Sequence, residues 1–110
     1  MKTQMEGNVT VVRLSNRFDA SNNDVFLHWL ETGVTPDAAQ VVVDLSDVTF
    51  VDSAALAALV KAARRCRQAG GDLRLCGLQK PVTIIFDLTR LDRAFSIYSD
   101  SEAAVSSFAS

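Results

Sequence analysis

The chain has 110 residues, of which 48% are hydrophobic and 22% are charged, a composition that fits a single soluble domain over residues 1–110. Its eleven basic and thirteen acidic residues give a net charge of -2, which argues against nucleic acid or an anionic membrane surface as a partner. The apolar stretches are far shorter than the roughly 20 residues needed to cross a bilayer. No signal-peptide core follows Met1, so we expect a cytoplasmic protein without membrane insertion.

The first third of the chain predicts a hairpin followed by a helix. A strand is expected at Val9–Leu14, which is rich in β-branched residues. The turn-forming pair Gly7–Asn8 before it predicts a short partner strand at Lys2–Glu6. A helix is expected over residues 21–32, since a polar capping segment precedes apolar residues at helical spacing and Gly33 is a typical stop.

The middle of the chain predicts a buried strand and a long helix. Val41–Leu45 is almost continuously apolar, as in a strand of a parallel sheet covered on both faces. From Ser53 the apolar residues recur every 3.6 positions until Gly70–Gly71. Four further elements are expected: a strand at Asp72–Cys76, a helix from Pro81 through Leu88, a short strand around Ile97–Tyr98 and a last helix from Ser101.

Alternation of strands and helices predicts an α/β fold with a mixed, mostly parallel sheet of four to five strands and about four helices packed on it. Polar groups gather where Val51 leads into the long helix. A helix start offers unpaired N–H groups and partial positive charge, which suit a capping side chain or a phosphate. Either Asp52 or Ser53 is expected to provide the cap.

The apolar stripe of the long helix predicts which of its residues face the core. Leu56, Leu59, Val60 and Ala63 share one side, whereas Ala54, Ala58, Lys61 and Arg65 are expected on the opposite side, beside Ala57. The exposed first turns around Ser53 would then carry only small side chains. Such a surface lets the backbone of a partner protein approach closely.

Metal and redox sites are not indicated. Cys66 and Cys76 form no Cys-x-x-Cys pair, and His28 is the only histidine, so both cysteines are expected to be buried free thiols and no cofactor is expected. Asp44, Asp47 and Asp52 fit no cation-binding loop pattern.

An enzyme is also disfavoured by the sequence. Serine catalysis needs a positioned base, but His28 lies within a helical pattern and is expected to be partly exposed. The chain has no Gly-x-Ser-x-Gly elbow and no phosphate-binding glycine loop. We therefore do not expect an enzyme.

Three segments in register, Asp44–Ser53, Gly70–Gly77 and Phe86–Phe95, resemble the STAS domain family, specifically the bacterial anti-sigma factor antagonists. The resemblance implies a STAS-like fold. It also implies that Ser53 is phosphorylated by an anti-sigma factor that is itself a serine kinase. The unphosphorylated form would bind this anti-sigma factor and release the sigma factor, and a serine phosphatase would reset the switch.

The resemblance also implies a partner-binding surface. Asp19 matches an interface aspartate in the loop after the second strand, and Asp52 would support Ser53. The implied surface comprises Asp19, Ser21, Asp52, Ser53, Ala54, Ala55 and Ala58.

The chain departs from the family pattern at two positions, Asn16 and Ala55, where the family usually has glycine. A methyl group at Ala55 is expected to obstruct a kinase that needs contact with the backbone. An alternative is a constitutive STAS scaffold or subunit, in a stress-signalling assembly or a lipid-transport ATPase complex, in which Ser53 is not a switch. Whether the protein forms a homodimer is left open by the sequence.

Overall fold

Five strands form one mixed sheet in the computed structural model, which describes residues 1–109. The strands are β1 (Lys2–Glu6), β2 (Val9–Phe18), β3 (Gln40–Val51), β4 (Asp72–Cys76) and β5 (Ile97–Tyr98). The helices are α1 (Asn23–Gly33), α2 (Ser53–Gln68), α3 (Lys80–Thr89), the 3-10 turn η1 (Leu91–Arg93) and α4 (Ser101–Ser106). The strands lie in chain order, with β1 antiparallel to β2 and the other neighbours parallel. The predicted fold class and every predicted element are confirmed.

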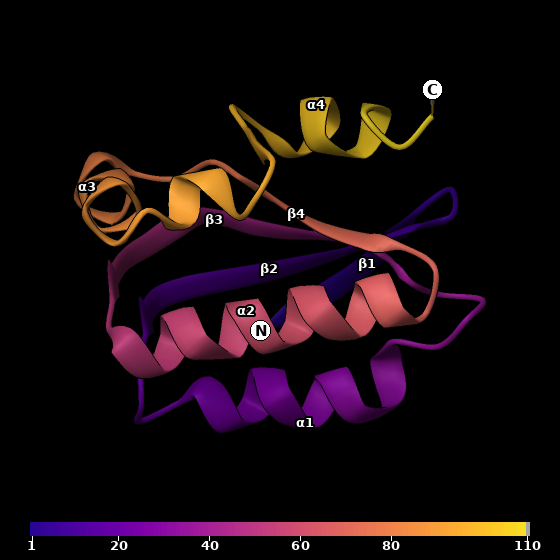
Figure 1. Cartoon of the computed structure of the whole chain (residues 1–110), viewed down its shortest axis with the longest axis horizontal. Coiled ribbons are helices and arrows are strands. Elements are labelled where there is room, and N and C mark those ends of the chain that lie inside the picture. The colour runs from indigo at the N-terminus through magenta and orange to yellow at the C-terminus, as the bar shows by residue number, and fades with distance from the viewer. Residues whose placement is uncertain (110) are drawn as a thin grey trace.

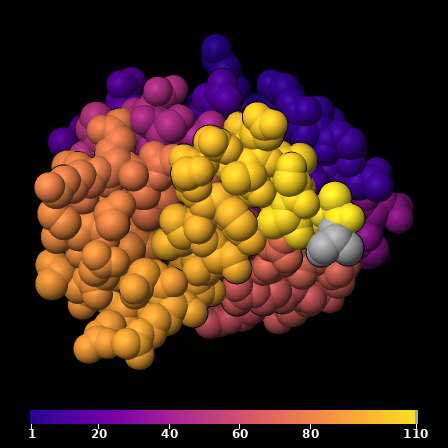
Figure 2. All heavy atoms as spheres, turned by 90° about the horizontal axis from the view of Figure 1, so that it is seen from above, coloured from indigo at the N-terminus to yellow at the C-terminus, as the bar shows by residue number. Residues whose placement is uncertain are grey.

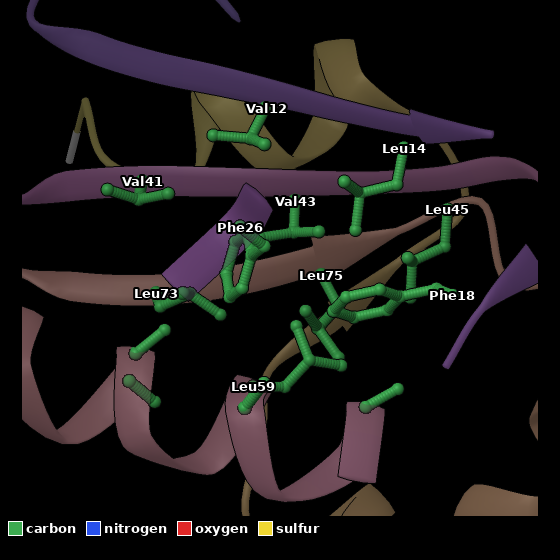
Figure 3. Close-up of a cluster of buried hydrophobic side chains, with 14 of the residues drawn as sticks. Val12, Leu14, Phe18, Phe26, Val41, Val43, Leu45, Leu59, Leu73 and Leu75 are labelled. Atoms are coloured by element: carbon green, nitrogen blue, oxygen red, sulfur yellow. The ribbon is translucent and has the colours of Figure 1, made fainter. Parts of the chain in front are cut away.

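The helices lie on both sides of the sheet (Figure 1). Helices α1 and α2 cover one face, α4 lies over the other, and α3 packs beside the far end of β3. The main core fills the space between the sheet and α2, where Val41, Val43 and Leu59 are fully buried (Figure 3). A smaller apolar cluster lies under α4 and includes Val42 and Ala104.

Helix α2 has two packing surfaces, because it contacts α1 as well as the sheet. Ala58 is only 3% exposed for this reason, so the prediction that it lies on the accessible side of the helix is wrong. Ala55 is also fully buried. Lys61 and Arg65 are exposed as predicted, whereas Val60, expected in the core, is half-buried.

Strands β2 and β3 extend beyond their predicted ends. The prediction stopped at Leu14 and Leu45, where the continuous apolar pattern ends, but the two strands remain paired until Phe18 and Val51. Two register shifts interrupt this extension, and Asn16 adopts a left-handed conformation with φ of 62°. Glycine adopts this conformation most easily, and asparagine tolerates it better than most residues. Asparagine is thus compatible with the backbone at a position where the family usually has glycine.

The core position of Leu59 predicts a large stability loss on truncation. Leu59→Ala should reduce the free energy of unfolding by about 2–5 kcal/mol, because it removes buried methyl groups and leaves a cavity. Leu88→Ala is the matched control, since Leu88 is 78% exposed and its truncation should change stability by less than about 0.5 kcal/mol. Urea unfolding of both variants measures the difference, and similar losses would contradict the packing described here.

Candidate functional site

The carboxyl ends of β2 and β3 bring the loop after β2 next to the start of α2. Parallel pairing places Phe18 opposite Val51 at the last position of both strands. The chain therefore leaves the sheet twice at neighbouring points, into residues 19–22 and into Asp52–Ser53. The sequence did not predict this extended pairing, because the polar residues in the added parts of β2 and β3 are typical of loops.

The carboxylate of Asp52 joins these two segments. Its Oδ1 accepts a hydrogen bond from the backbone N–H of Ala55 at 2.9 Å, which caps α2. Its Oδ2 accepts a hydrogen bond from the backbone N–H of Ala20 at 3.0 Å. Of the two capping candidates, the structure therefore selects Asp52. The hydroxyl of Ser53 is therefore not needed as the capping acceptor for a backbone N–H at the start of α2.

Ser53 is exposed on the first turn of α2. The neighbouring side chains are small: Ala20 is exposed and Ala54 is half-buried. Ala57, one turn further along, is also exposed. A second protein can therefore approach the Ser53 hydroxyl without displacing long side chains, as the sequence predicted for this part of the helix.

Asp19 is only 6% exposed and organises the loop after β2. Its carboxylate accepts hydrogen bonds from the hydroxyl and the backbone N–H of Ser21 and from Nε of Arg17, the last at 2.9 Å. The hydrogen bond from the Ser21 hydroxyl, followed by the bond from Arg17, holds the pKa of Asp19 below its ordinary value of 3.8. Asp19 therefore remains ionised at neutral pH and fixes the loop from within.

Two asparagines complete the loop and were not predicted to do so. Asn22 is the N-cap residue of α1, but its side chain makes no capping hydrogen bond. It instead accepts from the backbone N–H of Asp19 and donates to the carbonyl of Arg17. Asn23, the first residue of α1, donates to the carbonyl of Ala54 at 3.2 Å and so links the start of α1 to the start of α2. The polar composition of this segment suggested only a helix start.

Arg17 and Phe50 form a further exposed feature at the ends of β2 and β3. The guanidinium of Arg17 lies 4.2 Å from the centre of the Phe50 ring, and Phe50 is 39% exposed. The two residues are register partners in the sheet. No sequence motif indicates this pair, because it depends on the register shift between β2 and β3.

The structure thus brings most of the implied partner surface together and removes two residues from it. Asp19, Ser21, Asp52, Ser53 and Ala54 belong to the two adjacent segments. Ala55 and Ala58 are buried and do not contribute side chains to the surface. The methyl group of Ala55, which was expected to obstruct a kinase, is fully buried and does not lie on the surface that a partner would meet.

The remaining titratable residues were compared with the arrangement that a metal centre needs. Within residues 1–109, no group of three His, Cys, Asp or Glu side chains is arranged to hold a metal ion. Asp44 is buried as predicted and pairs with Nε of Arg13 at 3.3 Å. Cys66 and Cys76 are buried free thiols, also as predicted, and burial raises their pKa values to about 11 and about 12. None of the helices in residues 1–109 has the length and apolar character to span a bilayer.

The structure has a five-stranded mixed sheet, and Asp52 and Ser53 lie at the start of α2. This agrees with the fold that the resemblance to the STAS family implied. The model of the STAS domain family matches residues 1–104. The chain therefore belongs to the STAS domain family.

Individual relatives agree with this assignment. The chain is 24% identical over 98 residues to the anti-sigma F factor antagonist of Paenibacillus polymyxa, covering 88% of this chain and 84% of that protein. Its fold matches an anti-sigma factor antagonist from Mycobacterium paratuberculosis with a TM-score of 0.86 at 22% identity, covering 96% of this chain and 90% of the other. It also matches the phosphorylated form of SpoIIAA, a Bacillus cell fate determinant, with a TM-score of 0.77 at 16% identity and 97% coverage of both chains.

The double role of Asp52 predicts an unusually large effect of its removal. Asp52→Ala should lower the free energy of unfolding by about 1–2 kcal/mol through the lost cap, with up to about 1 kcal/mol more from the lost bond to Ala20. Asp100→Ala is the matched control, because Asp100 caps α4 in the same way through the N–H of Ala103. Urea unfolding that gave equal losses for both variants would argue against the bridging role.

The ionised state of Asp19 predicts an acid-dependent contribution to stability. Because its folded-state pKa lies below 3.8, its contribution is complete above that value and is lost as the pH falls through the folded-state pKa. The variant Asp19→Asn should therefore be less stable at pH 7 and lose less stability than the wild type between about pH 5 and pH 2. Urea unfolding across this range measures the effect, and parallel pH profiles would contradict it.

Proposed function

We propose that this protein is a cytoplasmic anti-sigma factor antagonist, a binding protein rather than an enzyme, that is switched by phosphorylation of Ser53. In its unphosphorylated form it binds an anti-sigma factor with serine kinase activity. That kinase phosphorylates Ser53 and is then released, and a serine phosphatase restores the binding form. The names of its STAS relatives support the antagonist role.

One observation carries the proposal: Ser53 is an exposed hydroxyl at a helix start whose capping requirement is already met by Asp52. Because the Asp52 carboxylate already accepts the hydrogen bond from the backbone N–H of Ala55, the Ser53 hydroxyl is not committed to the cap. Here the hydroxyl is accessible, and its position is held by the hydrogen bonds of Asp52 to both adjoining segments. The site therefore presents an exposed hydroxyl in a fixed position to a kinase.

Phosphorylation at this position is compatible with the fold. A phosphate adds about -1.5 to -2 charges at neutral pH, and the partial positive charge of a helix start tolerates that charge. A Bacillus relative whose phosphorylated form has been solved shares the fold of this chain. We therefore expect phosphorylation to act on the partner interface and not on the folded structure.

The surroundings of Ser53 explain how the added charge would block binding. The hydroxyl lies among small side chains, so a docked partner would cover it closely. A phosphate in that interface would lose its hydration unless the partner supplied matching positive charge, which costs affinity. Each 1.4 kcal/mol of such cost weakens binding by a factor of about ten.

The alternative is a constitutive scaffold that uses the same surface without a switch. The two functions differ in one measurable property, the response of partner binding to negative charge at Ser53. A scaffold would bind its partner equally well with serine or aspartate at this position. The uncommitted hydroxyl of Ser53 favours the switch.

Substitutions at Ser53 test the proposal directly. Wild-type protein should capture an anti-sigma factor kinase from the native lysate, and Ser53→Asp should bind that kinase at least about tenfold more weakly because of the added charge. With ATP, the captured kinase should add one phosphate to the wild type and none to Ser53→Ala. Binding constants and mass spectrometry measure these outcomes.

The chain contains a matched control at the start of α4. Ser101 is the first residue of that helix and follows the capping residue Asp100, as Ser53 follows Asp52, but α4 lies over the face of the sheet opposite to α2 (Figure 1). Ser101→Asp should bind the kinase like the wild type, and Ser101→Ala should still be phosphorylated. Unchanged binding by Ser53→Asp would favour the constitutive scaffold, and labelling that persists in Ser53→Ala would assign the modification elsewhere.

A further inference from the structure

Strand β1 is the outermost strand of the sheet, and its outer edge is uncovered. It pairs on one side with β2, and no other strand within residues 1–109 pairs with it. All five of its residues, Lys2–Glu6, are exposed. Figure 2 shows the indigo amino-terminal segment at the rim of the molecule, beside the yellow atoms of α4 and not beneath them. This edge presents backbone donors and acceptors to any strand that can add to it.

The hairpin geometry determines which backbone groups point outward. The two-residue turn Gly7–Asn8 has Gly7 at φ of 62° and closes on the pair Glu6 and Val9. In such a hairpin the closing pair is hydrogen-bonded, and bonded and non-bonded pairs then alternate along the strands. The N–H and C=O groups of Thr3 and Met5 consequently point away from β2 and are available to a second strand.

We propose that β1 pairs antiparallel with β1 of a second copy of this chain, about a twofold axis that passes through Gln4. In this register each Thr3 lies opposite Met5 of the second copy, so the outward-pointing groups form hydrogen-bonded pairs. Each Lys2 lies opposite Glu6 of the second copy, since the sequence Lys-Thr-Gln-Met-Glu is complementary in charge to its own reverse. The two sheets would then form one continuous ten-stranded sheet.

The charges select this register over the others. Parallel pairing in register would place Lys2 opposite Lys2 and Glu6 opposite Glu6, and like charges directly opposite are unfavourable. Registers centred on Thr3 or Met5 also use the outward-pointing groups, but they do not place Lys2 opposite Glu6 of the second copy. Only the register centred on Gln4 joins both charges in two symmetric ion pairs.

The surroundings of Lys2 in its own chain also favour an ion pair with a second copy. Its register partner in β2 is Arg13, another cation. Asp44, the carboxylate beside Arg13, is already paired with Arg13 at 3.3 Å. Within residues 1–109, no carboxylate forms an ion pair with Lys2. Glu6 of a second copy would supply the missing negative charge.

A charge reversal and its compensation test the proposal in solution. Sedimentation over micromolar to millimolar concentrations should show the wild type in a weak monomer–dimer equilibrium, since a five-residue edge is small for an interface. Lys2→Glu should raise the dissociation constant about tenfold or more, because two attractive pairs become repulsive. The double variant Lys2→Glu/Glu6→Lys exchanges the charges and should restore the dimer to near wild-type affinity.

A second pair of variants tests the backbone pairing. Met5→Pro removes an outward N–H that β2 does not use, and proline is tolerated at a strand edge for that reason. This variant should remain folded by circular dichroism and be monomeric, whereas Met5→Thr keeps the N–H and should still dimerise. A wild type that stays monomeric up to millimolar concentration, or a dimer that Lys2→Glu and Met5→Pro leave unchanged, would overturn the proposal. Failure of the folded double variant to recover would also overturn it.

Discussion

The hydrogen bonds of the Asp52 carboxylate are the constraint on which the candidate site depends. One oxygen caps α2 and the other holds the backbone of Ala20, so a single side chain closes a helix start and attaches the loop of a neighbouring strand. Both bonds involve an ionised acceptor, which makes them stronger than bonds between neutral groups. Because Asp52 caps α2, the hydroxyl of the neighbouring Ser53 is not needed for the cap, and Ser53 is exposed.

The arrangement suits regulation by charge better than regulation by a change of shape. The loop after β2 is organised internally by Asp19, whose carboxylate holds Ser21 and Arg17, and is linked to α2 through Asn23. A surface built in this way is fixed before a partner arrives, so little conformational entropy is lost on binding. Under the proposed switch, a phosphate added to such a surface would act by its charge and its hydration and would require no second conformation of the protein.

The two proposed contact surfaces use different parts of the same sheet. The site around Ser53 lies at the carboxyl ends of β2 and β3, whereas self-pairing uses the free edge of β1. The two surfaces have no side chain in common. A protein built in this way can associate with itself and bind a regulatory partner through separate interactions, each with its own dependence on charge.

Local sequence patterns determined the order and type of the elements. The apolar run at Val41–Leu45 and the helical spacing after Ser53 each reflect burial against a sheet, which a periodic pattern records directly. Only the tertiary structure decided which small residues of α2 are accessible. Ala58 is buried because α1 packs on the side of α2 that the sequence pattern left open, and a single periodic stripe does not reveal a second packing partner. The bond from Ala20 to Asp52 likewise depends on the pairing of strand ends that are 33 residues apart in the register Phe18–Val51.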